Sequence, residues 1–75
     1  MNSDELAKSA NLYLEQYSTN SNSIVVELLD SLHVIEFVEL IENNLGRVLT
    51  DIEITTCLNL PIGKVGRYLH ELETT

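Results

Sequence analysis

The residues of this chain that could do chemistry lie at its middle, where the sequence reads Asp30-Ser31-Leu32-His33. A serine becomes a nucleophile when a base activates it, as in the G-x-S-x-G turn of hydrolases, and no such turn surrounds Ser31. The neighbouring base, His33, lies two positions further on, and helical side chains with that spacing do not face each other. We therefore expect Ser31 to be exposed, unactivated and a substrate for another enzyme. No residue is assigned a catalytic role.

A helix over residues 31–45 is expected to position Ser31. Its apolar residues recur at three- and four-residue steps, the period of one buried helical stripe. They are Val34, Phe37, Val38, Ile41 and Leu45. Ser31 precedes the stripe, where a serine hydroxyl can cap a helix, and Gly46 follows it, where glycine suits a left-handed cap. A plain helix cap is therefore the alternative role for Ser31.

The opposite face of this helix is acidic but carries aliphatic residues. At roughly 100° per residue it holds Leu32, Ile35, Glu36, Glu39, Glu42 and Asn43. Each neighbouring pair of glutamates costs about 0.2 to 0.5 kcal/mol, and no lysine or arginine in the helix offsets this. We interpret the face as a docking surface for a basic partner, with Leu32 and Ile35 as apolar anchors. The alternative is a solvated acidic face with two isolated aliphatics.

An Asp-Ser-Leu tripeptide that opens an acidic amphipathic helix resembles the acyl and peptidyl carrier proteins. The chain length and the mid-chain position of the serine also match that family. The resemblance implies covalent 4'-phosphopantetheine on Ser31, within the motif of Asp30 and Leu32. A phosphopantetheinyl transferase would install it from coenzyme A with magnesium. Its thiol would carry an acyl, aminoacyl or peptidyl group as a thioester in fatty acid, polyketide, nonribosomal peptide or related biosynthesis.

The same resemblance implies which residues meet other proteins. Asp30, Glu36 and Glu39 match the acidic positions through which the family contacts loading and downstream enzymes with basic surfaces. Two features depart from the commonest pattern: His33 stands where an acidic residue is usual, and Leu28-Leu29 replaces small residues. The leucine pair looks more like discrete carriers of aminoacyl groups or of specialised biosynthesis.

Composition narrows the classes of partner. The chain has 75 residues, 44% of them apolar, and a net charge of −8, which suits one small domain spanning residues 1–75. Twelve acidic against four basic residues argue against nucleic acid or an anionic membrane surface as partner. No stretch approaches a membrane span, and the first residues do not resemble a signal peptide. We expect a cytoplasmic monomer.

The remaining elements suggest an all-α fold, a small bundle of three main helices plus one short helix with a long first loop. Apart from residues 31–45, we expect main helices over residues 3–17, with a capping box from Asn2 and Glu5, and 61–73. A short helix over 51–57 would be capped by Thr50 or Asp51. Residues 18–23 form a polar loop, and residues 24–29 continue that loop because they have no partner strand.

Other polar and aromatic residues receive structural roles. Cys57 suits a small buried hydrophobe, and as the one cysteine of the sequence it makes no internal disulfide. Gly63 and Gly66 cost the last helix about 1 kcal/mol each, which suggests a closely approaching backbone. Tyr13, Tyr17 and Tyr68 are expected in the core, and His33 and His70 at exposed helix ends.

No metal site is predicted. A calcium-binding loop beginning at Asp30 fails, because Leu32 and Val34 stand where ligands belong and Ile35 where glycine is needed. An enzyme is disfavoured because so small a chain lacks a pocket with a paired acid and base. The second hypothesis is an acidic helical adaptor that binds a basic protein through the same face and carries no prosthetic arm.

Overall fold

The computed structural model describes residues 3–74, with side chains from Glu5 onward. These residues form five helices and no strand, so the all-α prediction is confirmed. The helices are α1 (Ser3–Glu15), α2 (Val25–Leu28), α3 (Ser31–Leu45), α4 (Asp51–Leu58) and α5 (Ile62–Glu73). None of them is long and apolar enough to cross a membrane.

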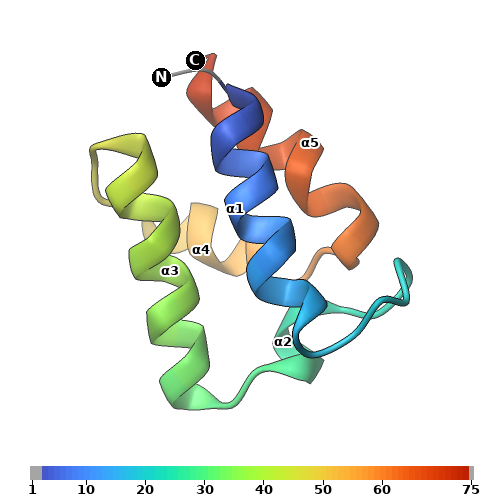
Figure 1. The fold of residues 1–75 in the computed structure, drawn as a ribbon. Coiled ribbons are helices and arrows are strands. Elements are labelled where there is room, and N and C mark those ends of the chain that lie inside the picture. The colour runs from blue at the N-terminus through green and yellow to red at the C-terminus, as the bar shows by residue number, and fades with distance from the viewer. Residues whose placement is uncertain (1–2, 75) are drawn as a thin grey trace.

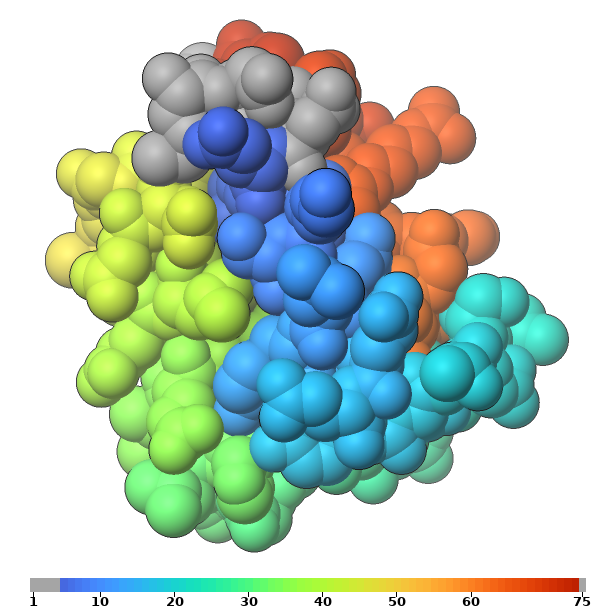
Figure 2. All heavy atoms as spheres, in the orientation of Figure 1, coloured from blue at the N-terminus to red at the C-terminus, as the bar shows by residue number. Residues whose placement is uncertain are grey.

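Helix α1 lies between α3 and α5 (Figure 1), and its most extensive contact is with α5. On the face shown in Figure 2, α1 fills the space between these two helices. Most of the fully buried side chains come from these three helices: Leu6, Ala10 and Leu14 on α1, Phe37 and Ile41 on α3, and Val65 and Leu69 on α5. Cys57 on α4 is also buried, as predicted.

The helix expected over residues 31–45 is confirmed at both ends. Helix α3 spans Ser31–Leu45, and Gly46 follows it in the left-handed conformation with φ 77°. That residue donates its backbone N–H to the carbonyl of Glu42 at 2.8 Å. Glycine reaches this conformation without the steric cost of a Cβ, so the helix ends where the apolar stripe ends.

Two predictions within the first 30 residues were wrong in detail. Helix α1 ends at Glu15 rather than Tyr17, because the amides of Gln16 and Tyr17 donate three residues back, to Tyr13 and Leu14. Such bonds tighten the last turn and end an α-helix. The capping residue expected at Asn2 lies outside the described residues.

The second correction concerns residues 24–29, which were expected to continue the loop. They include the one-turn helix α2, which begins after an isolated bridge between Ile24 and Pro61. Val25 donates its N–H to the carbonyl of Leu60 at 3.1 Å, and its side chain is fully buried. Backbone pairing with the segment before α5 therefore holds this part of the chain against the bundle.

The short helix α4 has a complete N-terminal cap. Thr50 accepts the amide of Glu53 at 3.1 Å, and Glu53 accepts the amide of Thr50 at 2.9 Å. The Arg47 guanidinium also donates a hydrogen bond to each oxygen of the Glu53 carboxylate, both at 2.9 Å. These bonds lower the pKa of Glu53 to about 2, the arginine being the largest cause. Two neighbouring elements, the α3–α4 connection and α4, are thereby tied together.

Candidate functional site

Ser31 is the first residue of α3 and is exposed. It does not cap the helix, which corrects one expectation: the cap is Asp30, whose Oδ1 accepts the backbone N–H of His33 at 2.9 Å. Among the described residues, the Ser31 hydroxyl makes no hydrogen bond. Because its neighbour performs the capping, the serine oxygen remains available to solvent and to other molecules.

His33 turns back toward Asp30 rather than toward the serine. Its Nδ1 lies 2.6 Å from Asp30 Oδ1, and its ring meets the ring of Tyr17 edge-on at 5.5 Å. The histidine is therefore half-buried, not exposed as expected. The hydrogen bond from the backbone of His33, followed by that from its side chain, lowers the pKa of Asp30. Asp30 is thus held as a carboxylate, and no base among the described residues forms a hydrogen bond with the Ser31 hydroxyl.

The two aliphatics on the acidic face of α3 are exposed. Leu32 retains 62% and Ile35 55% of their accessible surface, and both stand beside exposed Glu36 and Glu39. Isolated exposed aliphatics are ordinary, but these two lie one turn apart near the N-terminus of one helix. Together with Ser31 they form one continuous stretch of accessible α3 surface.

The three glutamates of this face have different surroundings. Glu36 accepts the hydroxyl of Tyr13 at 3.2 Å. Glu42 is half-buried and accepts the backbone N–H of Leu49 at 2.8 Å, which holds the connection to α4 against α3. Among the described residues, Glu39 makes no side-chain hydrogen bond. Of the three, Glu39 is therefore the carboxylate most available to a partner.

Tyr13 links α1 to the start of α3, a connection that sequence reasoning missed. Its hydroxyl also donates to the carbonyl of His33 at 3.2 Å, and its ring stacks on Phe37 with centroids 5.7 Å apart. Burial is the main cause that raises its pKa. Tyr13 and Tyr68 pack against the core as predicted, whereas Tyr17 keeps 36% of its surface exposed.

The described residues hold no cluster of three or more His, Cys, Asp or Glu side chains that could bind a metal. Burial raises the pKa of the Cys57 thiol to about 12, so this cysteine is not a reactive nucleophile at neutral pH. His70 lies exposed in the last turn of α5, as expected.

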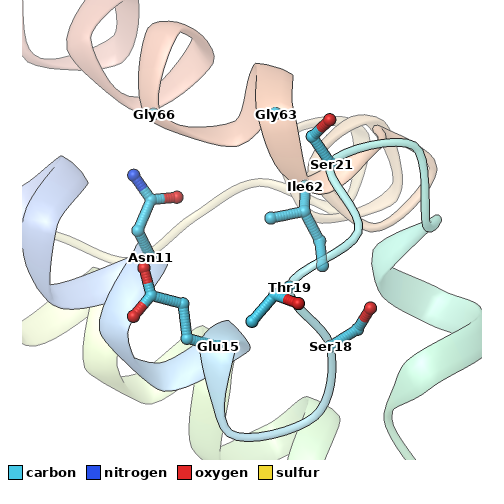
Figure 3. Close-up of a pocket in the computed structure, with 8 residues that line it drawn as sticks. All are labelled: Asn11, Glu15, Ser18, Thr19, Ser21, Ile62, Gly63 and Gly66. Carbon is cyan, nitrogen blue, oxygen red and sulfur yellow. The ribbon is translucent and has the colours of Figure 1, made fainter.

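A cleft of about 270 Å³ separates the end of α1 from the beginning of α5, with the loop between α1 and α2 as its third wall (Figure 3). Its polar side chains come from residues 11–21 and its opposite wall from residues 62–66. No motif in the sequence indicated this cleft, because its two sides are about fifty positions apart and meet only through the packing of α1 on α5.

Comparison with protein-family models, with curated proteins and with solved structures finds no significant match to this chain.

Proposed function

We propose that this chain is a stand-alone carrier protein that bears 4'-phosphopantetheine on Ser31. The observation that carries the proposal is an exposed serine, within Asp-Ser-Leu, whose hydroxyl has no hydrogen-bond partner among the described residues and which begins an amphipathic acidic helix. An acyl, aminoacyl or peptidyl group would be carried on the thiol of the arm as a thioester. This agrees with the resemblance to acyl and peptidyl carrier proteins.

The position of Ser31 suits an attached phosphodiester. The positive end of the α3 dipole lies at Ser31 and favours an anion by about 0.3 to 1 kcal/mol, an effect that the phosphodiester would share with the capping carboxylate of Asp30. The side chains of Ser31 and Leu32 are both exposed, so an attached group meets no steric obstacle there. Residue and location therefore fit the arm.

The chain's own residues would perform delivery rather than catalysis. The bond between His33 and Asp30 leaves Ser31 without a base, so the attachment reaction would depend on a separate transferase that uses coenzyme A and magnesium. Leu32, Ile35, Glu36 and Glu39 would form the docking surface for that transferase and for loading and downstream enzymes. Charge complementarity favours rapid association more than tight binding, which suits a carrier that changes partners.

The test is modification in vitro. The purified chain is incubated with coenzyme A, magnesium and a panel of phosphopantetheinyl transferases, and intact-mass spectrometry follows the addition of one arm. We expect the wild type and a Ser9→Ala control to be modified and Ser31→Ala to remain unmodified. Modification of Ser31→Ala would place the arm elsewhere.

A wild type that no transferase modifies would refute the carrier proposal. That result would favour the second hypothesis, an acidic helical adaptor that meets a basic protein through the same α3 face. The two functions differ in their need for the serine. Ser31→Ala should leave partner binding by an adaptor unchanged, whereas it should abolish every function of a carrier.

A further inference from the structure

Helix α3 begins beside two residues that could each serve as its cap. Aspartate and serine cap helices about equally well, and Asp30 and Ser31 are neighbours in the sequence. In the structure Asp30 is the cap: its Oδ1 accepts the backbone N–H of His33, and its carbonyl accepts that of Val34 at 2.9 Å. The Ser31 hydroxyl is left without a partner among the described residues. Whatever selects Asp30 as the cap therefore also keeps the serine available.

The alternative cap would occupy the serine. With Ser31 as the cap, the helix would begin one residue later, the serine would be extended, and its Oγ would accept the backbone N–H of His33 or Val34. Attachment of the arm needs that oxygen as the nucleophile. It bonds to the phosphorus of coenzyme A that bears the pantetheine, the bond from this phosphorus to adenosine bisphosphate breaks, and the hydroxyl proton passes to a base of the transferase. An oxygen already engaged by the helix is a poorer substrate.

The side chain of His33 makes the contact that favours Asp30 as the cap. Its Nδ1 lies 2.6 Å from Asp30 Oδ1, the same oxygen that accepts the backbone N–H. An ionised carboxylate only accepts hydrogen bonds, so Nδ1 carries the hydrogen and donates it. In an ordinary capping box the residue three positions after the cap is Glu or Gln and reaches the backbone of the cap. Ser31 has no comparable support, because the residue three positions after it is Val34.

Two tyrosines hold His33 in place. The ring of Tyr17, in the turn after α1, meets the His33 ring edge-on with centroids 5.5 Å apart. The hydroxyl of Tyr13 donates to the His33 carbonyl at 3.2 Å. A ring that contacts both Asp30 and Tyr17 has few rotamers open to it, which lowers the entropy lost when its bond to Asp30 forms. The end of α1 therefore supports the capping contact of α3.

We propose that His33 is a positioning residue for the modification of Ser31: by holding Asp30 in the capping position, it keeps the serine hydroxyl free for the phosphopantetheine arm. The inference rests on the carrier function proposed above and adds the residue that prepares its attachment site. His33 acts through Asp30 and makes no hydrogen bond to the hydroxyl. A net intramolecular hydrogen bond changes an equilibrium about two- to tenfold, so its loss should move the population toward the Ser31 cap by that factor.

NMR spectra of the unmodified chain test the cap directly. Nitrogen–proton correlations of the imidazole distinguish a hydrogen on Nδ1 from one on Nε2, and the carbon shifts of Ser31 distinguish a helical residue from an extended cap. For the wild type we expect the hydrogen of the neutral His33 ring on Nδ1 and helical shifts for Ser31. These spectra need no transferase, so they report on the cap whether or not the chain is a carrier.

Two variants separate the hydrogen bond from the ring contact. His33→Phe keeps a ring beside Tyr17 but has no N–H to donate, and its Ser31 carbon shifts should move toward those of a cap. His33→Asn loses the ring but has a side-chain nitrogen one bond from Cγ, as Nδ1 is, and should restore the helical shifts. Phenylalanine, asparagine and histidine have similar helix propensities, so propensity does not separate the variants.

Modification is then compared in one reaction that contains the wild type and both variants, limiting coenzyme A and a transferase that modifies the wild type. Intact-mass spectrometry of the mixture gives the ratios of kcat/KM. His33→Phe should lose kcat/KM in proportion to the chains that adopt the Ser31 cap, about twofold when the two caps are equally populated. At saturating carrier its kcat should be unchanged, because binding selects the competent form. His33→Asn should recover the loss, and the distant control His70→Phe should show none.

Helical Ser31 shifts in His33→Phe, or a wild-type ring with its hydrogen on Nε2, would overturn the inference while leaving the carrier function in place. Equal losses of kcat/KM in both His33 variants would indicate a direct contact between the imidazole and the transferase, and would overturn it as well. A wild type that no transferase modifies would overturn the carrier function instead, and the spectra would still decide whether His33 sets the cap.

Discussion

Alanine at the two glycines of α5 should have opposite effects on stability. At Gly66 the new Cβ meets its neighbours at 3.4 to 3.5 Å, so no atom has to move. The substitution then gains the helix propensity of alanine, about 1 kcal/mol. For a domain of this size such a gain corresponds to a rise in Tm of about 4 to 8 °C.

At Gly63 the same gain is opposed by the loop. The Cβ would stand 3.1 Å from Ser21 Cβ and 3.3 Å from a backbone oxygen, and neither atom is the free end of a flexible side chain. Overpacking of this kind costs about 1 to 3 kcal/mol, which exceeds the propensity gain. We expect Gly63→Ala to lose up to about 2 kcal/mol and to lower the Tm accordingly.

The assay is thermal unfolding followed by far-UV circular dichroism under identical buffer and salt, analysed as a two-state transition. Because the two substitutions are chemically the same and lie one turn apart on one helix, their difference isolates the contact with the loop. A Tm for Gly63→Ala equal to that for Gly66→Ala would show that the loop does not press on α5. In that case the close approach of Ser21 would not be what requires glycine at position 63.

Three further predictions follow from individual contacts. The pKa of Glu53 is lowered to about 2 from its ordinary 4.5, with the hydrogen bond from Arg47 as the largest cause, so the stabilisation from this pair is complete above about pH 5 and is lost as the pH falls toward 2. The urea midpoint of the wild type should therefore fall over this pH range. In Glu53→Gln that part of the pH dependence should be absent. Cys57 is 2% exposed, with its pKa raised to about 12, and should react with iodoacetamide only in denaturant; rapid reaction of the native chain would contradict its burial. Glu42→Ala leaves the backbone amide of Leu49 without its acceptor and should lower the free energy of unfolding in urea by about 1 to 3 kcal/mol. The matched change Glu39→Ala should alter that free energy by less than about 0.5 kcal/mol.

The sequence predicted α3 well because two independent signals agreed there: a long apolar stripe and a glycine directly after it. It did not identify the cap. Asp30 and Ser31 are both good N-cap residues, and no glutamate or glutamine follows at the spacing that would have distinguished them. For α4 that signal was present, because Glu53 stands three residues after Thr50 and completes a capping box with it.

Features made by contacts distant along the chain could not be predicted. Helix α2 is too short to show a periodicity, and the backbone of residues 60–62 holds it in place. Tyr13 reaches across twenty residues to the start of α3. The cleft depends on the packing of α1 against α5, so its two walls have no relation that the order of residues alone could reveal.

The contact between α1 and α5 has a consequence for how the chain acquires its fold during synthesis. The apolar side of α1, including Leu6 and Leu14, is covered completely only after α5, the last helix, has been synthesised. Contacts this distant in sequence form late, since the ends of a long loop have to meet first. A nascent chain arrested before residue 62 would therefore leave those leucines without the helix that covers them and open to chaperones and proteases.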